Sequence, residues 1–132
     1  MLTLDYISNV VHGDLFFEKI CSADIDWDEQ LDRRDTGEFD ENWTSNHEIV
    51  QNAEAPMFPD SEMDKLREFA FTKVFALTQN PDLASYVSDD FGLIGEAVRK
   101  NTVTPWIRRL IHDYMEGTFP TSSRVDENGT DE

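Results

Sequence analysis

The stretch SEMDKLREFAFTKVFALTQ, residues 61–79, decides the fold. Its apolar side chains recur every three or four positions, which is the period of an α-helix. The repeating set is Leu66, Phe69, Ala70, Val74 and Leu77. Phe71 and Phe75 add a second apolar ridge. A helix that is apolar around so much of its circumference is predicted to lie at the centre of the core.

The two ends of this helix are marked in the sequence. Ser61 is a natural N-cap, and Glu62 and Asp64 favour the positive end of the helix dipole. Pro81 disfavours helical backbone at the residue before it, so the helix is predicted to end near Gln79.

Further helices are predicted on the C-terminal side. Residues 83–86 form one helical turn, and Ser88 or Asp89 then caps a helix with Arg99 and Lys100 at its negative end. That helix carries Phe91, Ile94, Ala97 and Val98. Thr104 followed by Pro105 is the favoured start of a last helix, which runs to about Glu116 before Gly117 stops it. The face of that last helix is formed by Ile107, Leu110, Ile111 and Tyr114.

The N-terminal half is less regular. Short helices are predicted at residues 2–11 and 14–22, a loop with one helical turn at 23–38, and a helix at 40–53. Two prolines make residues 54–60 a connector. No segment alternates as a strand does, so the fold class is mainly α: a small irregular helical bundle with an acidic, loop-rich N-terminal half. Residues 1–120 form a single domain, and residues 121–132 form a disordered acidic tail.

Composition restricts the classes of partner. The chain of 132 residues has 28 acidic and 11 basic side chains, a formal net charge of -17. Such a charge repels nucleic acid and anionic membranes and attracts cations and basic protein surfaces. The start of the chain lacks the pattern of a secretory signal, and no run of 18 apolar residues occurs, so a cytoplasmic location is expected. Cys21 is the single cysteine, which excludes an intramolecular disulfide.

The acidity is concentrated in the first half. Residues 1–60 carry 15 acidic and 3 basic side chains, whereas residues 61–120 carry 9 and 7. Ten carboxylates lie between residues 24 and 48, opposed there only by Arg33 and Arg34. A solvated surface that aids solubility is one interpretation. The near-neutral second half and the aromatic residues Trp27, Phe39 and Trp43 within the acidic stretch favour a docking surface instead.

The predicted partner-binding residues follow from this interpretation. They are Asp24, Asp26, Trp27, Asp28, Glu29, Asp32, Asp35, Glu38, Asp40, Glu41 and Trp43. Glu48 is the tenth carboxylate of the stretch. Phe39 is an aromatic residue that packs either against the partner or in the core.

Residues 24–28 have carboxylates at alternate positions, like the start of an EF-hand calcium loop. Glu29 stands where that loop needs glycine, and Asp35 stands where it needs the longer glutamate. No metal ligand or cofactor is therefore assigned, although a calcium-binding module remains an alternative.

No catalytic constellation is recognisable. His12, His47 and His112 lack metal-ligand spacing, and the serines lack the Gly-x-Ser-x-Gly context of a nucleophile. Cys21 falls on an apolar helix face and is interpreted as buried filler. The sequence is not expected to be an enzyme.

The segments YVSDDFGLI, residues 86–94, and YMEGTFP, residues 114–120, resemble the helical end of immunity proteins of bacterial toxin systems, of the colicin and contact-dependent inhibition types. The resemblance covers about the last third of the compact part and carries over no site residue. It implies a protein that binds and neutralises a cognate toxin, which in such families is often a nuclease with a basic substrate cleft.

Two other functions fit the same charge pattern. One is a DNA mimic from a phage or mobile element that blocks a DNA-binding defence protein, such as a restriction or CRISPR component. The other is an acidic helical subunit of a larger complex. A mimic competes with DNA for many basic proteins, whereas a toxin inhibitor binds a single partner.

Overall fold

The computed structural model describes residues 3–13, 15–21, 26–35, 38–54 and 61–121, and within them it contains helices and no strands. The predicted fold class is thereby confirmed. The helices are α1 (Leu4–Val11), α2 (Phe16–Cys21), α3 (Trp27–Asp35), α4 (Glu38–Asn52), α5 (Ser61–Thr78), α6 (Pro81–Arg99) and α7 (Pro105–Met115). The predicted connector after residue 54 and the predicted tail from residue 122 lie outside the described residues, whereas Thr121 is buried.

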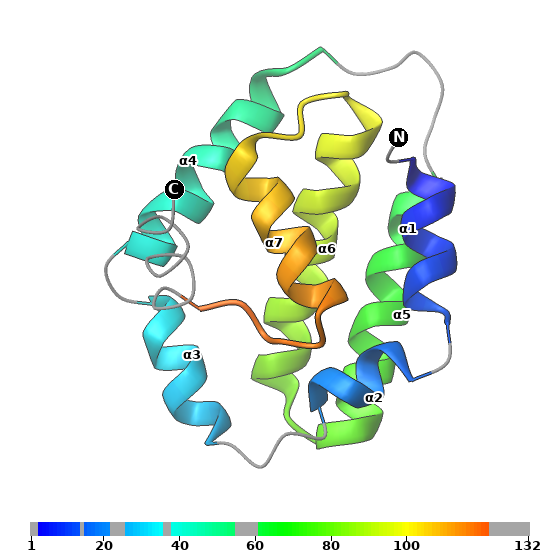
Figure 1. The fold of residues 1–132 in the computed structure, drawn as a ribbon, viewed down its shortest axis with the longest axis vertical. Helices are drawn as coiled ribbons and strands as arrows, with labels where there is room; N and C mark the ends of the chain where they lie inside the picture. The colour runs from blue at the N-terminus through cyan, green and yellow to red at the C-terminus, as the bar shows by residue number, and fades with distance from the viewer. Residues whose placement is uncertain (1–2, 14, 22–25, 36–37, 55–60, 122–132) are drawn as a thin grey trace.

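The helices are arranged around α6 and α7. Helices α3 and α4 lie along one edge of the molecule, and α1, α2 and α5 lie along the opposite edge (Figure 1). Helix α6 contacts α1, α4, α5 and α7, so it is the element that joins the two edges. This position is why side chains of α6 meet those of the acidic N-terminal helices.

Helix α6 is continuous, so the predicted break before Ser88 is wrong. The helix begins at Pro81 and is capped by Asn80, whose side chain accepts a hydrogen bond from the backbone N–H of Leu83 at 3.1 Å. Ser88 is not a cap: its hydroxyl donates to the carbonyl oxygen of Arg67 in α5 at 3.1 Å. The stronger start signal, Asn80 with Pro81, outweighs the weaker one eight residues later.

The centre of the core is α6, and not α5 as the sequence predicted. Helix α6 buries a set of residues spread around its circumference: Leu83, Ala84, Val87, Phe91, Leu93, Ile94 and Ala97. Helix α5 buries Leu66, Ala70 and Val74, but Leu77 on the same helix is 40% exposed and Phe75 is 38% exposed. Phe71 is partly buried against the core, so the side chains of α5 that face outward are those near its C-terminal end.

The remaining helix ends follow the sequence closely. Thr104 caps α7 by accepting from the backbone N–H of Ile107 at 3.1 Å, and Gly117 adopts a φ of +82° after the helix. Helix α5 ends at Thr78, as Pro81 predicted, while Ser61 is the first helical residue instead of the residue before it. Helices α1, α2 and α4 lie where short helices were predicted.

Helix α3 stands where a loop was predicted, and its inward face explains the difference. Trp27, Leu31 and Arg34 recur at helical spacing, and Leu31 and Arg34 are buried. Because one of these three inward positions holds a charged residue, the sequence does not show an apolar helical period here.

Helix α4 is held at its C-terminal end by Lys100, whose ammonium group donates to the carbonyl oxygen of Val50 at 3.0 Å.

Candidate partner-binding site

A buried ion pair joins the acidic half of the chain to α6. Arg34 of α3 is 5% exposed and Asp90 of α6 is fully buried. Arg34 donates two hydrogen bonds to the Asp90 carboxylate, from Nη1 to Oδ2 at 2.8 Å and from Nη2 to Oδ1 at 2.6 Å. This is the bidentate geometry in which an arginine and a carboxylate bind most strongly.

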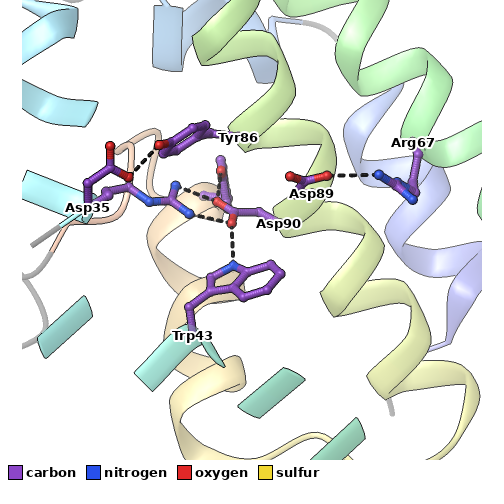
Figure 2. Close-up of polar contacts among 8 residues, drawn as sticks. Asp35, Trp43, Arg67, Tyr86, Asp89 and Asp90 are labelled. Carbon is purple, nitrogen blue, oxygen red and sulfur yellow. Dashed lines mark hydrogen bonds and ion pairs between the residues drawn. The ribbon is translucent and has the colours of Figure 1, made fainter. Parts of the chain in front are cut away.

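Two further donors complete the hydrogen bonding of Asp90. The indole Nε1 of Trp43 in α4 donates to Oδ1 at 2.9 Å, and the hydroxyl of Tyr114 in α7 donates to Oδ2 at 2.5 Å. Figure 2 shows Trp43 reaching Asp90 from below. Burial, together with the Asp90 charge, holds the pKa of the Tyr114 hydroxyl well above its usual value, so it remains a donor.

Aromatic rings enclose the other side of the Arg34 guanidinium. Its central carbon lies 4.3 Å from the ring centre of Phe39, 4.9 Å from that of Phe119 and 5.4 Å from that of Tyr86. Such cation–π contacts compensate part of the lost hydration of the cation. Burial lowers the pKa of Arg34, but Asp90 outweighs this effect and the pKa is raised overall.

We refer to Arg34, Trp43, Asp90 and Tyr114 as the Asp90 cluster. It brings together α3, α4, α6 and α7 at one carboxylate. The apolar anchoring of α3 is small, because Leu31 is the one hydrophobic residue that this helix fully buries within the described part of the chain. The Asp90 cluster therefore fixes the acidic helices on the core.

The predicted acidic residues reach the surface. Nine of the ten carboxylates between residues 24 and 48 are described and all nine are exposed: the predicted partner-binding residues Asp26, Asp28, Glu29, Asp32, Asp35, Glu38, Asp40 and Glu41, and also Glu48. Asp24 lies outside the described residues. Glu29 pairs with Arg33 at 3.1 Å, and Asp35 accepts a hydrogen bond from the hydroxyl of Tyr86. The same hydrogen bond raises the pKa of Tyr86 to about 12.

The predicted aromatic anchors are half-buried. Trp27 packs edge-on against Phe119, with ring centres 5.8 Å apart. Trp43 stacks on His47 at 5.3 Å and is held by Asp90 through its indole N–H. Phe39 is fully buried and packs against Trp106 in the core. Of the three aromatic residues in the acidic stretch, two retain exposed surface.

A cleft separates the start of α4 from the first half of α6. We refer to it as the Trp43 cleft; its walls are the aromatic side chains Phe39, Trp43 and Tyr86 and the carboxylates Asp35, Asp40 and Asp89. Its volume is about 250 Å³. Arg34 also borders it, but the charge of this guanidinium is matched by Asp90. The unmatched charge of the cleft is therefore negative.

Asp89 also faces a second cleft, on the other side of Trp43, which α5 helps to line. There Arg67 of α5 donates from Nη2 to Oδ1 of Asp89 at 2.9 Å, and both side chains are about half exposed. Figure 2 shows this pair beside the Asp90 cluster. Arg67 lies flat over Gly92, where a Cβ atom would come within 3.0 Å of its Cδ.

The structure argues against a calcium loop at residues 24–28. Trp27 begins α3, so Asp28 and Glu29 have helical backbone instead of wrapping around an ion. Asp26 serves as a helix cap, with its Oδ1 accepting from the backbone N–H of Glu29 at 3.3 Å. No group of three or more His, Cys, Asp or Glu side chains suited to a metal occurs in the described part of the chain.

The three histidines have different surroundings. His12 stacks on Phe69 at 3.8 Å, His47 stacks on Trp43, and His112 lies 3.8 Å from Glu116 on the same helix. Each thus has its own packing or pairing partner, and the three do not form a common site.

Cys21 is half-buried, and burial together with the nearby Glu18 raises the pKa of its thiol to about 11. Because the thiolate is the reactive form, we expect alkylation by iodoacetamide to accelerate about tenfold per pH unit from pH 7 to 10. Mass spectrometry of timed samples measures this rate, with glutathione as the reference thiol. A rate that levels off near pH 8 to 9 would contradict the raised pKa.

Sequence reasoning missed four residues of this region: Arg34, Tyr86, Asp89 and Asp90. Arg34 was counted only as an opposing charge, and the other three lie in the half of the chain that was set aside as nearly neutral. The signal that pointed to them was the segment 86–94, which was noted for its pattern and contains Tyr86, Asp89 and Asp90. Of its two adjacent aspartates, Asp89 is exposed and Asp90 is buried.

The architecture and the candidate site indicate a general class of protein. A small helical bundle that presents exposed carboxylates and an aromatic-walled cleft, held in place by a buried ion pair, has the features expected of a protein-binding module. Residues 6–121 match the family described as Immunity protein PIM1, and the chain belongs to this family. Its partner is accordingly a cognate toxin, and the chain is an inhibitor and not an enzyme.

No curated protein is significantly similar to the sequence. Among the described residues, no helix is both long enough and apolar enough to cross a membrane.

Proposed function

We propose that this immunity protein neutralises its toxin through the acidic surface formed by α3 and α4, and that the toxin is a nuclease acting in the cytoplasm. The observation that carries the proposal is the exposure of all eight carboxylates of these two helices and of Asp26 before α3; the two helices contact each other along one edge of the molecule (Figure 1). A nuclease must present a cationic cleft to bind phosphates. An acidic surface on a rigid scaffold is complementary to such a cleft.

The packing supports the proposal as well. Acidic helices repel one another, so without an internal attachment they would separate. The Asp90 cluster supplies this attachment from the buried side and leaves the outer faces of α3 and α4 accessible. A surface that is already ordered loses less conformational entropy on binding.

The test is a charge reversal on the outer faces of both helices. Asp28 and Glu41 are exposed, one on α3 and one on α4. We expect the variant Asp28→Lys, Glu41→Lys to bind the toxin encoded beside its gene about 100-fold more weakly, because like charges then meet across the interface. Calorimetry measures the affinity, and survival of cells expressing the toxin measures protection.

A matched control carries the same change in net charge elsewhere. Asp5 on α1 and Glu68 on α5 are also exposed, and these helices lie at the opposite edge (Figure 1). The variant Asp5→Lys, Glu68→Lys should keep its affinity within about threefold, since distant charges are screened by salt. If both double variants lose affinity equally, net charge and not the α3–α4 surface governs binding, and the site assignment is wrong.

A further inference from the structure

We propose that the Trp43 cleft receives an arginine side chain of the toxin, whose guanidinium binds Asp89 in competition with Arg67. This inference rests on the proposed function and narrows it: the outer faces of α3 and α4 attract the toxin, and the cleft provides the specific contact. The occupant is a guanidinium group presented by a protein.

The walls of the cleft have the two features that a guanidinium requires. Trp43 and Tyr86 offer aromatic faces and edges, and Asp35, Asp40 and Asp89 offer carboxylate oxygens. A guanidinium is planar and weakly hydrated, so it stacks on aromatic rings while its N–H groups bind carboxylates, which an ammonium group does less well. The shape and the charge of the cleft thus favour arginine over lysine.

The protein itself shows that this chemistry works at this place. On the buried side of the cleft, the Arg34 guanidinium is bidentate to Asp90 and is enclosed by the rings of Phe39, Tyr86 and Phe119. On the exposed side, the Arg67 guanidinium already pairs with Asp89 at 2.9 Å. Asp89 therefore accepts a guanidinium, but the one it holds comes from its own chain.

Arg67 is suited to give way. Its pair with Asp89 is about half exposed, and exposed pairs contribute little to stability. Arg67 lies over Gly92, which has no Cβ atom. No side chain at position 92 therefore holds the arginine in place. Removal of Arg67 should free the Asp89 carboxylate for an incoming guanidinium and should also remove a repelling positive charge.

A hexa-arginine peptide serves as the defined probe and a hexa-lysine peptide as its matched control, titrated calorimetrically at low salt. We expect the full chain to bind hexa-arginine about threefold more tightly than hexa-lysine. Asp89→Asn should weaken hexa-arginine binding about fivefold, whereas Arg67→Gln should strengthen it about threefold. Asp5→Asn removes an equal charge from α1, outside the cleft and outside the α3–α4 surface, and should weaken binding less than twofold.

The expected gain of affinity in Arg67→Gln separates a specific effect from misfolding, because a misfolded variant is not expected to bind the peptide more tightly. All three substituted side chains are exposed, and circular dichroism verifies that the helical content is unchanged. Equal weakening by Asp89→Asn and Asp5→Asn, or no gain in Arg67→Gln, would overturn the proposal. So would equal binding of the two peptides.

The same variants measured with the toxin separate the two proposals. If Asp28→Lys, Glu41→Lys weakens toxin binding but Asp89→Asn and Arg67→Gln leave it unchanged, the acidic surface stands and the cleft assignment fails. If the toxin responds to none of these variants, the acidic surface itself is wrong. Weaker toxin binding in Asp89→Asn together with tighter toxin binding in Arg67→Gln supports the assignment of the cleft as an arginine site.

Discussion

Replacing Asp90 with alanine is expected to lower the free energy of unfolding by about 3–5 kcal/mol, the usual cost of removing one partner of a buried ion pair. The change leaves the Arg34 guanidinium buried without its counter-charge. It also removes the acceptor of Trp43 Nε1 and of the Tyr114 hydroxyl. A domain is typically stable by only about 5–15 kcal/mol, so a large part of the total is at stake.

Urea denaturation measures this loss, and the adjacent residue provides the control. Asp89→Ala removes a neighbouring carboxylate of α6 that is about half exposed, and it should change the unfolding free energy by less than about 0.5 kcal/mol. A loss below about 1 kcal/mol in Asp90→Ala would show that the cluster does not hold the fold together.

A double variant distinguishes the ion pair from the packing around it. Arg34→Met with Asp90→Leu removes both charges and keeps apolar volume, so it should be more stable than Asp90→Ala alone. Hydrogen exchange should report the single variant's damage first in α3, because this helix has little other burial.

The second large effect concerns the rate at which the toxin is captured. Raising the salt concentration from about 50 to 500 mM is expected to slow association about 10- to 100-fold, because salt screens the attraction between a chain of net charge -17 and a basic partner. Stopped-flow mixing measures the rate. The dissociation rate should change much less, since it is set by close contacts.

The charge-reversal variant supplies the internal control for this measurement. In Asp28→Lys, Glu41→Lys the dependence of the association rate on salt should be shallower than in the unmodified protein, because part of the steering field is gone. An association rate that salt leaves unchanged would show that electrostatic attraction does not guide the encounter. The acidity would then serve solubility.

Helix ends were predictable from the sequence because their signals are local. Thr104 with Pro105 marks the start of α7 and Gly117 marks its end, each within a few residues of the end concerned, and the structure places them as expected. Asn80 with Pro81 is an equally local signal for α6, and it was overlooked in favour of Ser88. That error was one of interpretation, since the information was present in the chain.

The buried cluster was not predictable in the same way. Arg34 and Asp90 are 56 positions apart, and neither position reads as a core residue. The same pairing concealed α3, since a charged residue occupies one of its inward positions. The Trp43 cleft likewise needs α4 and α6 to be adjacent, which no local pattern indicates. The acidic side chains were predicted as exposed because charged residues seldom bury without a partner.

The central place of α6 also bears on the way the chain is made. A ribosome releases α1 to α4 before it has synthesised the helix on which they pack. Until then these segments have few contacts of their own, and their apolar side chains face water. Their excess of negative charge keeps nascent chains apart during this interval, because like charges oppose aggregation. The acidity proposed here to attract a toxin thus also protects the inhibitor before it has folded.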